Sequence, residues 1–247
     1  MLHHNDGGRV SRTFFRWVIP AVMLVAIDAC SDSPTAPDYD PQIDPANFVG
    51  AVTNPLFPLA PGTVWTYRDG SETTTIEVSS TTKTILGIQA TVVHDREFDD
   101  GELVEDTFDW FAQDRDGNVW YLGEDTRELE NGVVVSTDGS WEAGVDGAKP
   151  GIIMWGDPAA HLNEEYRQEF YDGEAEDWGK VVALNESVTV PYGSFTGCVK
   201  TEDWNDLEGG RSGSLENKWY CPTIGLVREQ DAAGGGGSVE LITLTRP

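Results

Sequence analysis

The sequence predicts a mainly β protein, a single antiparallel meander curled into a barrel, half-barrel or sandwich. Three observations predict this fold class. Short runs of β-branched and aromatic residues recur along the chain, and turn signals separate them at spacings of about 8–12 residues. No amphipathic helical stripe of any length interrupts them. An antiparallel meander is the simplest arrangement of such strands.

The first 29 residues have the pattern of a signal peptide. Three arginines precede an apolar run at 17–27, which is shorter than the about 20 residues that cross a bilayer. Ala29 and Cys30 then resemble the cleavage site of bacterial lipoproteins, where the cysteine is acylated and begins the mature chain. Asp28 departs from that pattern, and an ordinary secretory signal is the alternative. We therefore expect an exported protein held to the membrane by a lipid at Cys30, at the outer membrane or cell surface, with the periplasmic face as a second location.

Residues 30–55 predict a tether between this anchor and a β domain at 56–247. The segment contains five prolines, scattered Asp and few apolar residues. Such a composition favours extended, polyproline-like chain and cannot form a core.

The chain is strongly acidic, with 43 Asp and Glu against 16 Lys and Arg and a net charge of −27. Such a surface repels nucleic acid and anionic lipid headgroups. We therefore expect no nucleic-acid partner. The partners that remain are the membrane, reached through the lipid at Cys30, and a protein or small-molecule ligand that the sequence does not identify.

The expected strands follow one another from residue 62 to the C-terminus. Asn131-Gly132 between two short apolar runs predicts a two-residue hairpin. The glycine-rich stretch 231–238 predicts a loop, because it lacks the lysine and the following helix of a phosphate-binding loop. The strands are expected at 62–69, 73–80, 90–98, 103–113, 118–124, 127–136, 164–170, 180–190, 194–204, 216–221, 225–230 and 238–246.

The stretch AQDRDGNVWYLGEDT, residues 112–126, has the acidic residues of a calcium loop but not their spacing. With Gly117 at the sixth position of an EF-type loop, an alanine and a glycine occupy the first and twelfth positions, where ligands are required. A two-residue turn at Asp116-Gly117 fits better and pairs Phe111 with Leu122. The stretch therefore predicts a hairpin.

Cys198 and Cys221 flank a further expected hairpin. A turn centred on Gly209-Gly210 places the two cysteines opposite each other, which in an exported protein indicates a disulfide. A bulge in this long turn would shift the register and separate them.

Two segments carry candidate binding residues. Acidic residues and aromatic rings lie together at 166–180, and a glycine-rich loop at 136–158 contains two tryptophans. Long loops of this kind often carry function. A solvated connection and tryptophans that cap the sheet are the alternatives. The candidate ligand-binding residues are Trp141, Trp155, Tyr171 and Trp178, and the candidate metal ligands, for calcium, are Glu174, Glu176 and Asp177.

No catalytic residue is predicted. After Cys30 the only histidines are His94 and His161, and neither has a His or Cys neighbour at metal-ligand spacing. No G-x-S-x-G nucleophile motif occurs. Apart from calcium, no cofactor is expected.

Several motifs resemble a family of uncharacterised bacterial lipoproteins. They are FPLAPGTVWTYR at 57–68, DWFAQDRDGNVWYLGEDT at 109–126, GSWEAGVDGAKPGI at 139–152, VPYGSFTGCVKTEDW at 190–204 and KWYCPTIGLVRE at 218–229. The first and last are also similar to envelope proteins whose curled antiparallel sheet shelters lipids or lipoproteins. The resemblance implies a fold rather than an activity.

Two functions follow as expectations. The first is a non-catalytic binding or assembly module for an apolar ligand or a partner protein, with a cavity lined by aromatic and aliphatic residues. The second is a glycan-acting enzyme with two inward carboxylates about 5–10 Å apart in an aromatic cleft. A calcium-stabilised adhesive module is a third alternative.

Overall fold

The computed structural model describes residues 39–232 and 237–247. The predicted signal peptide and the predicted lipid anchor at Cys30 lie outside these residues. In the part of the chain that is described, no helix is long and apolar enough to cross a membrane.

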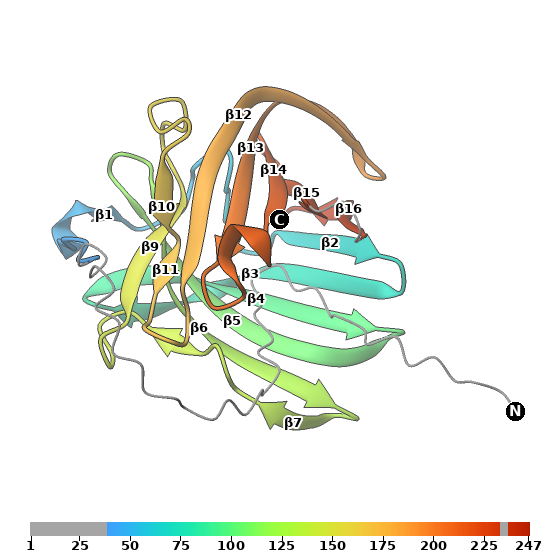
Figure 1. Cartoon of the computed structure of the whole chain (residues 1–247), viewed down its shortest axis with the longest axis horizontal. Coiled ribbons are helices and arrows are strands. Elements are labelled where there is room, and N and C mark those ends of the chain that lie inside the picture. Colours follow the sequence, from blue (N-terminus) through green and yellow to red (C-terminus); the bar gives the residue numbers. More distant parts are fainter. Residues whose placement is uncertain (1–38, 233–236) are drawn as a thin grey trace, which may run out of the picture.

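The described residues form one antiparallel sheet that is nearly closed into a barrel, which confirms the expected fold class (Figure 1). From β12 to β16, and again from β2 to β6, each strand pairs with the next one along the chain, and β16 pairs with β2. Two short 3-10 helices, η1 (Pro45–Asn47) and η2 (Gly210–Ser212), accompany the sheet. The strands are β1 (Phe48–Val49), β2 (Val64–Asp69), β3 (Glu72–Ile85), β4 (Ile88–Asp99), β5 (Glu102–Asp114), β6 (Val119–Glu130), β7 (Val133–Ser136), β8 (Trp141–Glu142), β9 (Lys149–Met154), β10 (Glu165–Arg167), β11 (Glu169–Phe170), β12 (Asp177–Val190), β13 (Gly193–Asn205), β14 (Glu216–Cys221), β15 (Gly225–Asp231) and β16 (Ser238–Thr245).

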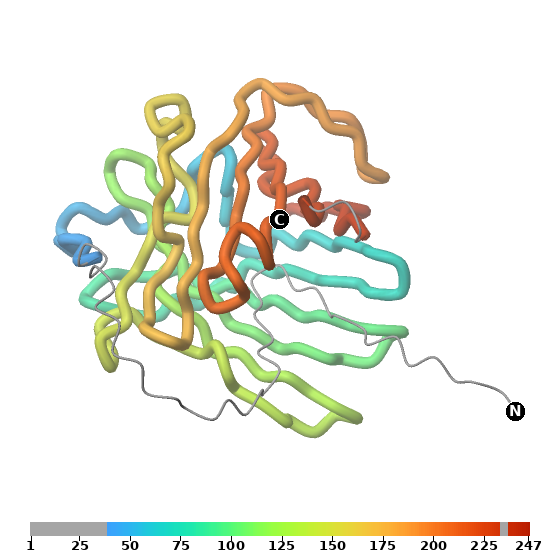
Figure 2. The backbone as a smooth tube through the Cα atoms, viewed as in Figure 1, coloured from blue at the N-terminus to red at the C-terminus, as the bar shows by residue number. Residues whose placement is uncertain are grey.

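The barrel closes through the segment 165–170. Its first half, β10, pairs with β12, and its second half, β11, pairs with β9 at the other end of the sheet. The change of partner occurs at Gln168, whose backbone N–H donates to the carbonyl of Asp177 at 2.8 Å. Gly151 on β9 permits the close approach, because a Cβ there would lie 2.4 Å from the carbonyl carbon of Gln168. The tube in Figure 2 shows the strands that result curving around one interior.

The hairpins follow the predicted turn residues. Asn131 and Gly132 have φ angles of 51° and 74°, as a two-residue primed turn requires, and they join β6 to β7. β7 carries Val133, Val134 and Val135, which are all exposed.

The β5–β6 hairpin exists as predicted, but its predicted register is wrong by one residue. Phe111 pairs with Tyr121 rather than with Leu122, because the loop has three residues and Gly117 takes a left-handed φ of 86°. The carboxylate of Asp114 accepts hydrogen bonds from the backbone N–H groups of Asp116 and Asn118 and from the indole N–H of Trp120, at 2.9–3.0 Å. The acidic residue therefore caps the loop.

Replacing Asp114 by alanine should destabilise the protein by about 1–3 kcal/mol, because several part-buried donors lose their acceptor at once. Asp116→Ala is the matched control, since Asp116 is exposed in the same loop. Chemical denaturation of the two variants measures the difference. Equal free energies of unfolding would contradict the capping role.

The N-terminal part of the described chain packs on the barrel, against the expectation of a free tether through residue 55. The Tyr39 hydroxyl donates to the Pro150 carbonyl at 2.8 Å, and Lys149 lies 3.1 Å from Asp40. β1 pairs with the end of β5, and Val52 is buried. The folded domain therefore begins no later than Tyr39, rather than at residue 56.

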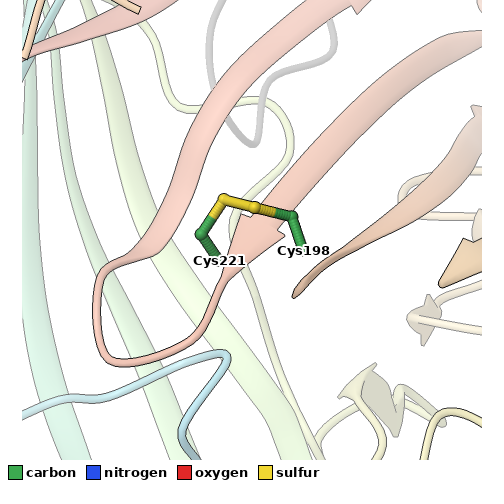
Figure 3. The surroundings of a disulfide bond; sticks show 2 residues. All are labelled: Cys198 and Cys221. Atoms are coloured by element: carbon green, nitrogen blue, oxygen red, sulfur yellow. A yellow bond between two sulfur atoms is a disulfide. The ribbon is translucent and has the colours of Figure 1, made fainter. Parts of the chain in front are cut away.

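Cys198 and Cys221 form a disulfide between β13 and β14 (Figure 3). The register pairs Val199 with Tyr220, as a turn centred on Gly209-Gly210 requires. Both cysteines are fully buried. A bond that closes a loop of this length stabilises a fold by about 3 kcal/mol.

Candidate functional site

The interior of the barrel is the candidate site. Alternate residues of each strand point inward, and the inward residues divide into an apolar group and an acidic group. On β4, Val93 is followed by Asp95 and Glu97, and on β5, Glu105 and Asp109 are followed, past a register shift, by Phe111. The same strands therefore line both halves of the interior.

The apolar half contains a hollow of about 40 Å³. A strap formed by residues 52–60 covers it, and the strap is held by a hydrogen bond from the Thr223 N–H to the Pro55 carbonyl at 2.6 Å. Phe57 lies over the hollow and packs edge-on against Phe111, with ring centroids 5.1 Å apart. No charged residue contributes to the lining. The lining residues are Phe57, Pro58, Leu59, Trp65, Tyr67, Ile76, Val93, Phe111, Tyr220, Gly225 and Leu226.

The acidic half places carboxyl groups on facing and neighbouring strands. Glu97 lies directly opposite Glu105, and Asp109 directly opposite Glu124. Like charges in such positions destabilise a sheet. Apart from Asp114, which caps its loop, the buried acidic residues are Asp95, Glu97, Glu105, Asp109, Glu124, Glu169, Asp177, Asp203 and Glu229.

Burial raises the pKa of two of these carboxyl groups, Asp95 and Asp109. The pKa of Asp95 lies well above its ordinary value, first because of desolvation and then because Asp109, Glu105, Glu97 and Glu229 are close. Desolvation is also the main cause of the raised pKa at Asp109, where the hydroxyl of Tyr121 opposes it by donating to Oδ1 at 2.7 Å.

A second set of coupled carboxyls lies where the barrel closes. Desolvation raises the pKa of Glu169, and its contacts with Asp177 and Trp141 oppose the shift. The pKa of Asp177 is raised well above its ordinary value, by desolvation and by Glu169. The pKa of Glu124 is also raised well above its ordinary value, by desolvation and by Asp109.

Among the described residues, Lys218 is the only lysine or arginine that is buried. Its ammonium lies 3.4 Å from Asp203 Oδ2 and 3.4 Å from Glu229 Oε2. These carboxylates raise the lysine pKa against the opposing effect of burial. One ammonium cannot balance nine carboxylates, so most of the acidic half needs protons or other cations.

The free energy of unfolding should fall as pH rises from about 4 to about 7. The pKa values of Asp109 and Glu169 are raised to about 7 in the folded chain, whereas an unfolded carboxyl has lost its proton above about 4. Protons bound only by the folded state stabilise it below the unfolded pKa, and this stabilisation is lost as pH rises through the folded pKa. Denaturation at pH 5 and pH 8 measures a difference of a few kcal/mol.

Asp109→Asn should reduce this dependence, because the amide oxygen still accepts from Tyr121 but carries no charge. Glu102→Gln, an exposed change on the same strand, should leave the dependence unchanged. Stability that stays constant or rises between pH 5 and pH 8 would show that the buried carboxyls do not act in this way.

The candidate aromatic residues do not form one site. Trp141 is buried and packs edge-on against Tyr121, at a centroid distance of 5.4 Å. Trp155 stacks on His161 at 3.7 Å. Tyr171 lies in a tight turn, where its backbone bridges to Ala175.

Trp178 belongs to an outer stack of cations and rings. It lies parallel to Trp204 at 6.1 Å, and the guanidinium groups of Arg167 and Arg211 lie over the two rings, 4.1 Å and 4.3 Å from the centroids of Trp178 and Trp204 respectively. The indole N–H of Trp178 donates to Asp206 at 2.7 Å. Each ring therefore has a guanidinium group over one of its faces.

The candidate metal ligands point in different directions. Glu174 is exposed in the turn, Glu176 lies 3.7 Å from Arg167, and Asp177 is buried. In the described part of the chain, no three His, Cys, Asp or Glu side chains are gathered closely enough to hold a metal ion. The three side chains thus lie in different surroundings in this structure.

The acidic interior is the feature that the sequence analysis missed. A signal was present, because Asp95 and Glu97 alternate with His94 and Arg96 on one strand. Both faces of that strand are polar, so alternation alone did not indicate which face is buried.

No family model and no curated protein matches the sequence. Two solved structures are similar to the chain. One, from Bacteroides fragilis, is assigned as an exported protein with a YmcC-like fold, with 15% identity and a TM-score of 0.44. The other, from Parabacteroides distasonis, is assigned as a lipoprotein, with 15% identity and a TM-score of 0.41. Each alignment covers 77% of this chain and 98% of the other. A likeness of this size does not transfer function.

Proposed function

We propose that this chain is an exported lipoprotein, anchored through Cys30, whose barrel is a non-catalytic binding module for an apolar ligand. The N-terminal pattern that ends at Cys30 supports the anchor. A buried disulfide supports export, because such bonds persist in oxidising compartments.

The apolar hollow is the observation that carries the binding role. Its lining is aromatic and aliphatic, and apolar cavities remain dry and accept apolar molecules. At about 40 Å³ the hollow holds only a few atoms. Phe57 and Pro58 are partly exposed, whereas the lining beneath them is buried. Displacement of the Phe57 ring would therefore open the hollow to the end of an acyl chain.

The geometry favours binding over the glycan-acting alternative. The inward carboxylates that an enzyme would use are closed off, since Asp109 is 0% exposed and Glu169 is 1% exposed. Neither the apolar hollow nor the shallow surface hollow beside Phe48 and Trp120 is lined by these two residues. A glycosidic bond could not reach them in this arrangement.

A brominated fatty acid should quench part of the tryptophan fluorescence saturably, because the indole of Trp65 lines the hollow and is fixed by a hydrogen bond to the Ile224 carbonyl at 2.8 Å. Phe57→Ala should strengthen the binding by enlarging the hollow, and Val93→Phe should weaken it at least tenfold by filling the space. Val133→Phe, on an exposed strand, is the control. Unsaturable quenching, or equal affinity in the Val93 and Val133 variants, would exclude the hollow as the site.

The anchor is tested separately by mass spectrometry of the mature N-terminus. We expect a chain that begins at Cys30 and carries acyl groups, and we expect Cys30→Ser to move the protein from the membrane fraction to the soluble fraction. An unprocessed N-terminus, or an unmodified cysteine, would contradict the anchor and leave the hollow unaffected.

A further inference from the structure

The acidic half of the interior contains a carboxylate that lacks a partner. Both carboxylate oxygens of Asp95 are buried without a hydrogen bond, and the residue is only 3% exposed. A buried ionised group in this state is costly, because the interior replaces none of the hydration that it has lost. Asp95 therefore points to a missing counter-charge. The carboxylate of Asp114, by contrast, accepts hydrogen bonds from its own loop.

The sheet register gathers further carboxyl groups around Asp95. Asp95 lies opposite Thr107, so Glu105 and Asp109 are its two diagonal neighbours on β5. Glu97 follows two residues later on β4 and points to the same side. Diagonal neighbours have Cα atoms about 7–8 Å apart, a separation that two carboxylates can bridge through one ion.

Every side chain named in this group presents oxygen. The carboxylates are joined by the hydroxyl group of Thr107, and no histidine or cysteine is among them. Oxygen donors select hard cations rather than zinc or copper. Lys218 on β14, elsewhere in the same interior, shows that a cation can lie between two of the interior carboxylates.

We propose that the acidic half of the barrel binds a hard divalent cation, calcium in the first place, with Asp95 as the central ligand and Asp109 and Glu105 as its neighbours. Calcium suits this set better than magnesium, because it accepts six to eight oxygens in irregular geometry whereas magnesium demands a strict octahedron. The carboxylates are not gathered at ligand distance in the structure, so binding draws side chains of β4 and β5 together. The observations behind this proposal involve neither the apolar hollow nor the lipid anchor.

Thermal unfolding of the full chain at pH 8 tests the proposal. About 5 mM calcium should raise Tm by several degrees over chelator at matched ionic strength, because a ligand of the native state stabilises it by mass action. Asp95→Asn should abolish the shift while keeping the shape of the side chain. Glu102→Gln, an exposed change on β5, should retain the shift. Since Asp95→Asn removes an unpaired buried charge, it is expected to fold.

Terbium luminescence provides a direct measure of occupancy. Tyr121 donates to Asp109 and so lies beside the proposed ion, which makes it a sensitiser. The wild-type protein should show sensitised emission that calcium displaces, and Asp95→Asn should lose at least tenfold in affinity. A calcium shift equal in wild type and Asp95→Asn would assign the ion to the acidic surface and overturn the proposal. The absence of any calcium-induced change in Tm would also overturn it, because the interior would then bind only protons. An equal change in Tm with ethylenediamine would overturn it as well, because the interior would then bind any small cation.

Discussion

The closure of the sheet by residues 165–170 is the constraint on which the rest of the structure depends. This short segment pairs with β12 through its first half and with β9 through its second. Without it, the inner faces of β4, β5 and β6 would belong to an open sheet in contact with water, and a row of carboxylates there would be unremarkable. With it, the same residues lie in an interior from which solvent is excluded, and each charge has to be neutralised or bound. Gly151, which lets the crossing backbone approach, is therefore a determinant of the electrostatics as well as of the fold.

Closure also explains why the interior is divided along its length. The strap at 52–60 brings Leu56, Phe57 and Leu59 to one half, and these residues need apolar partners on the strands beneath them. The other half contains the buried carboxyl groups and Lys218. The two halves meet on β4, where Val93 contributes to the hollow and Asp95 belongs to the acidic group. The same strands thus line two chemically different regions of one interior.

The sequence predicted those features that local chemistry decides. Alternation and turn residues located the strands, and the primed turn at Asn131-Gly132 formed because few other residues accept two positive φ angles. The predicted register of the β5–β6 hairpin was wrong next to the loop, because a three-residue loop displaces the pairing by one residue. A register shift near Trp110 brings the strands back to the predicted pairing farther from the loop. The packing of residues 39–55 could not be read from composition, because a few anchoring residues such as Tyr39 and Val52 outweigh a proline-rich background. The acidic interior was missed for a different reason, namely that a strand with polar residues on both faces does not reveal which face is inside.

If both proposed sites are occupied, their shared wall would make them thermodynamically dependent on each other. An apolar molecule beneath the strap would add apolar atoms next to the region of Asp95 and lower the local dielectric, which raises the cost of every carboxylate that remains ionised there. The binding free energy of a cation that neutralises those carboxylates then becomes more favourable. Reciprocity requires that the cation strengthen binding of the apolar molecule by the same factor. Val93 and Asp95, two residues apart on one strand and pointing to the same side, form the shortest physical connection between the sites. A protein that takes up an apolar ligand and a cation together could therefore release both when either one is withdrawn.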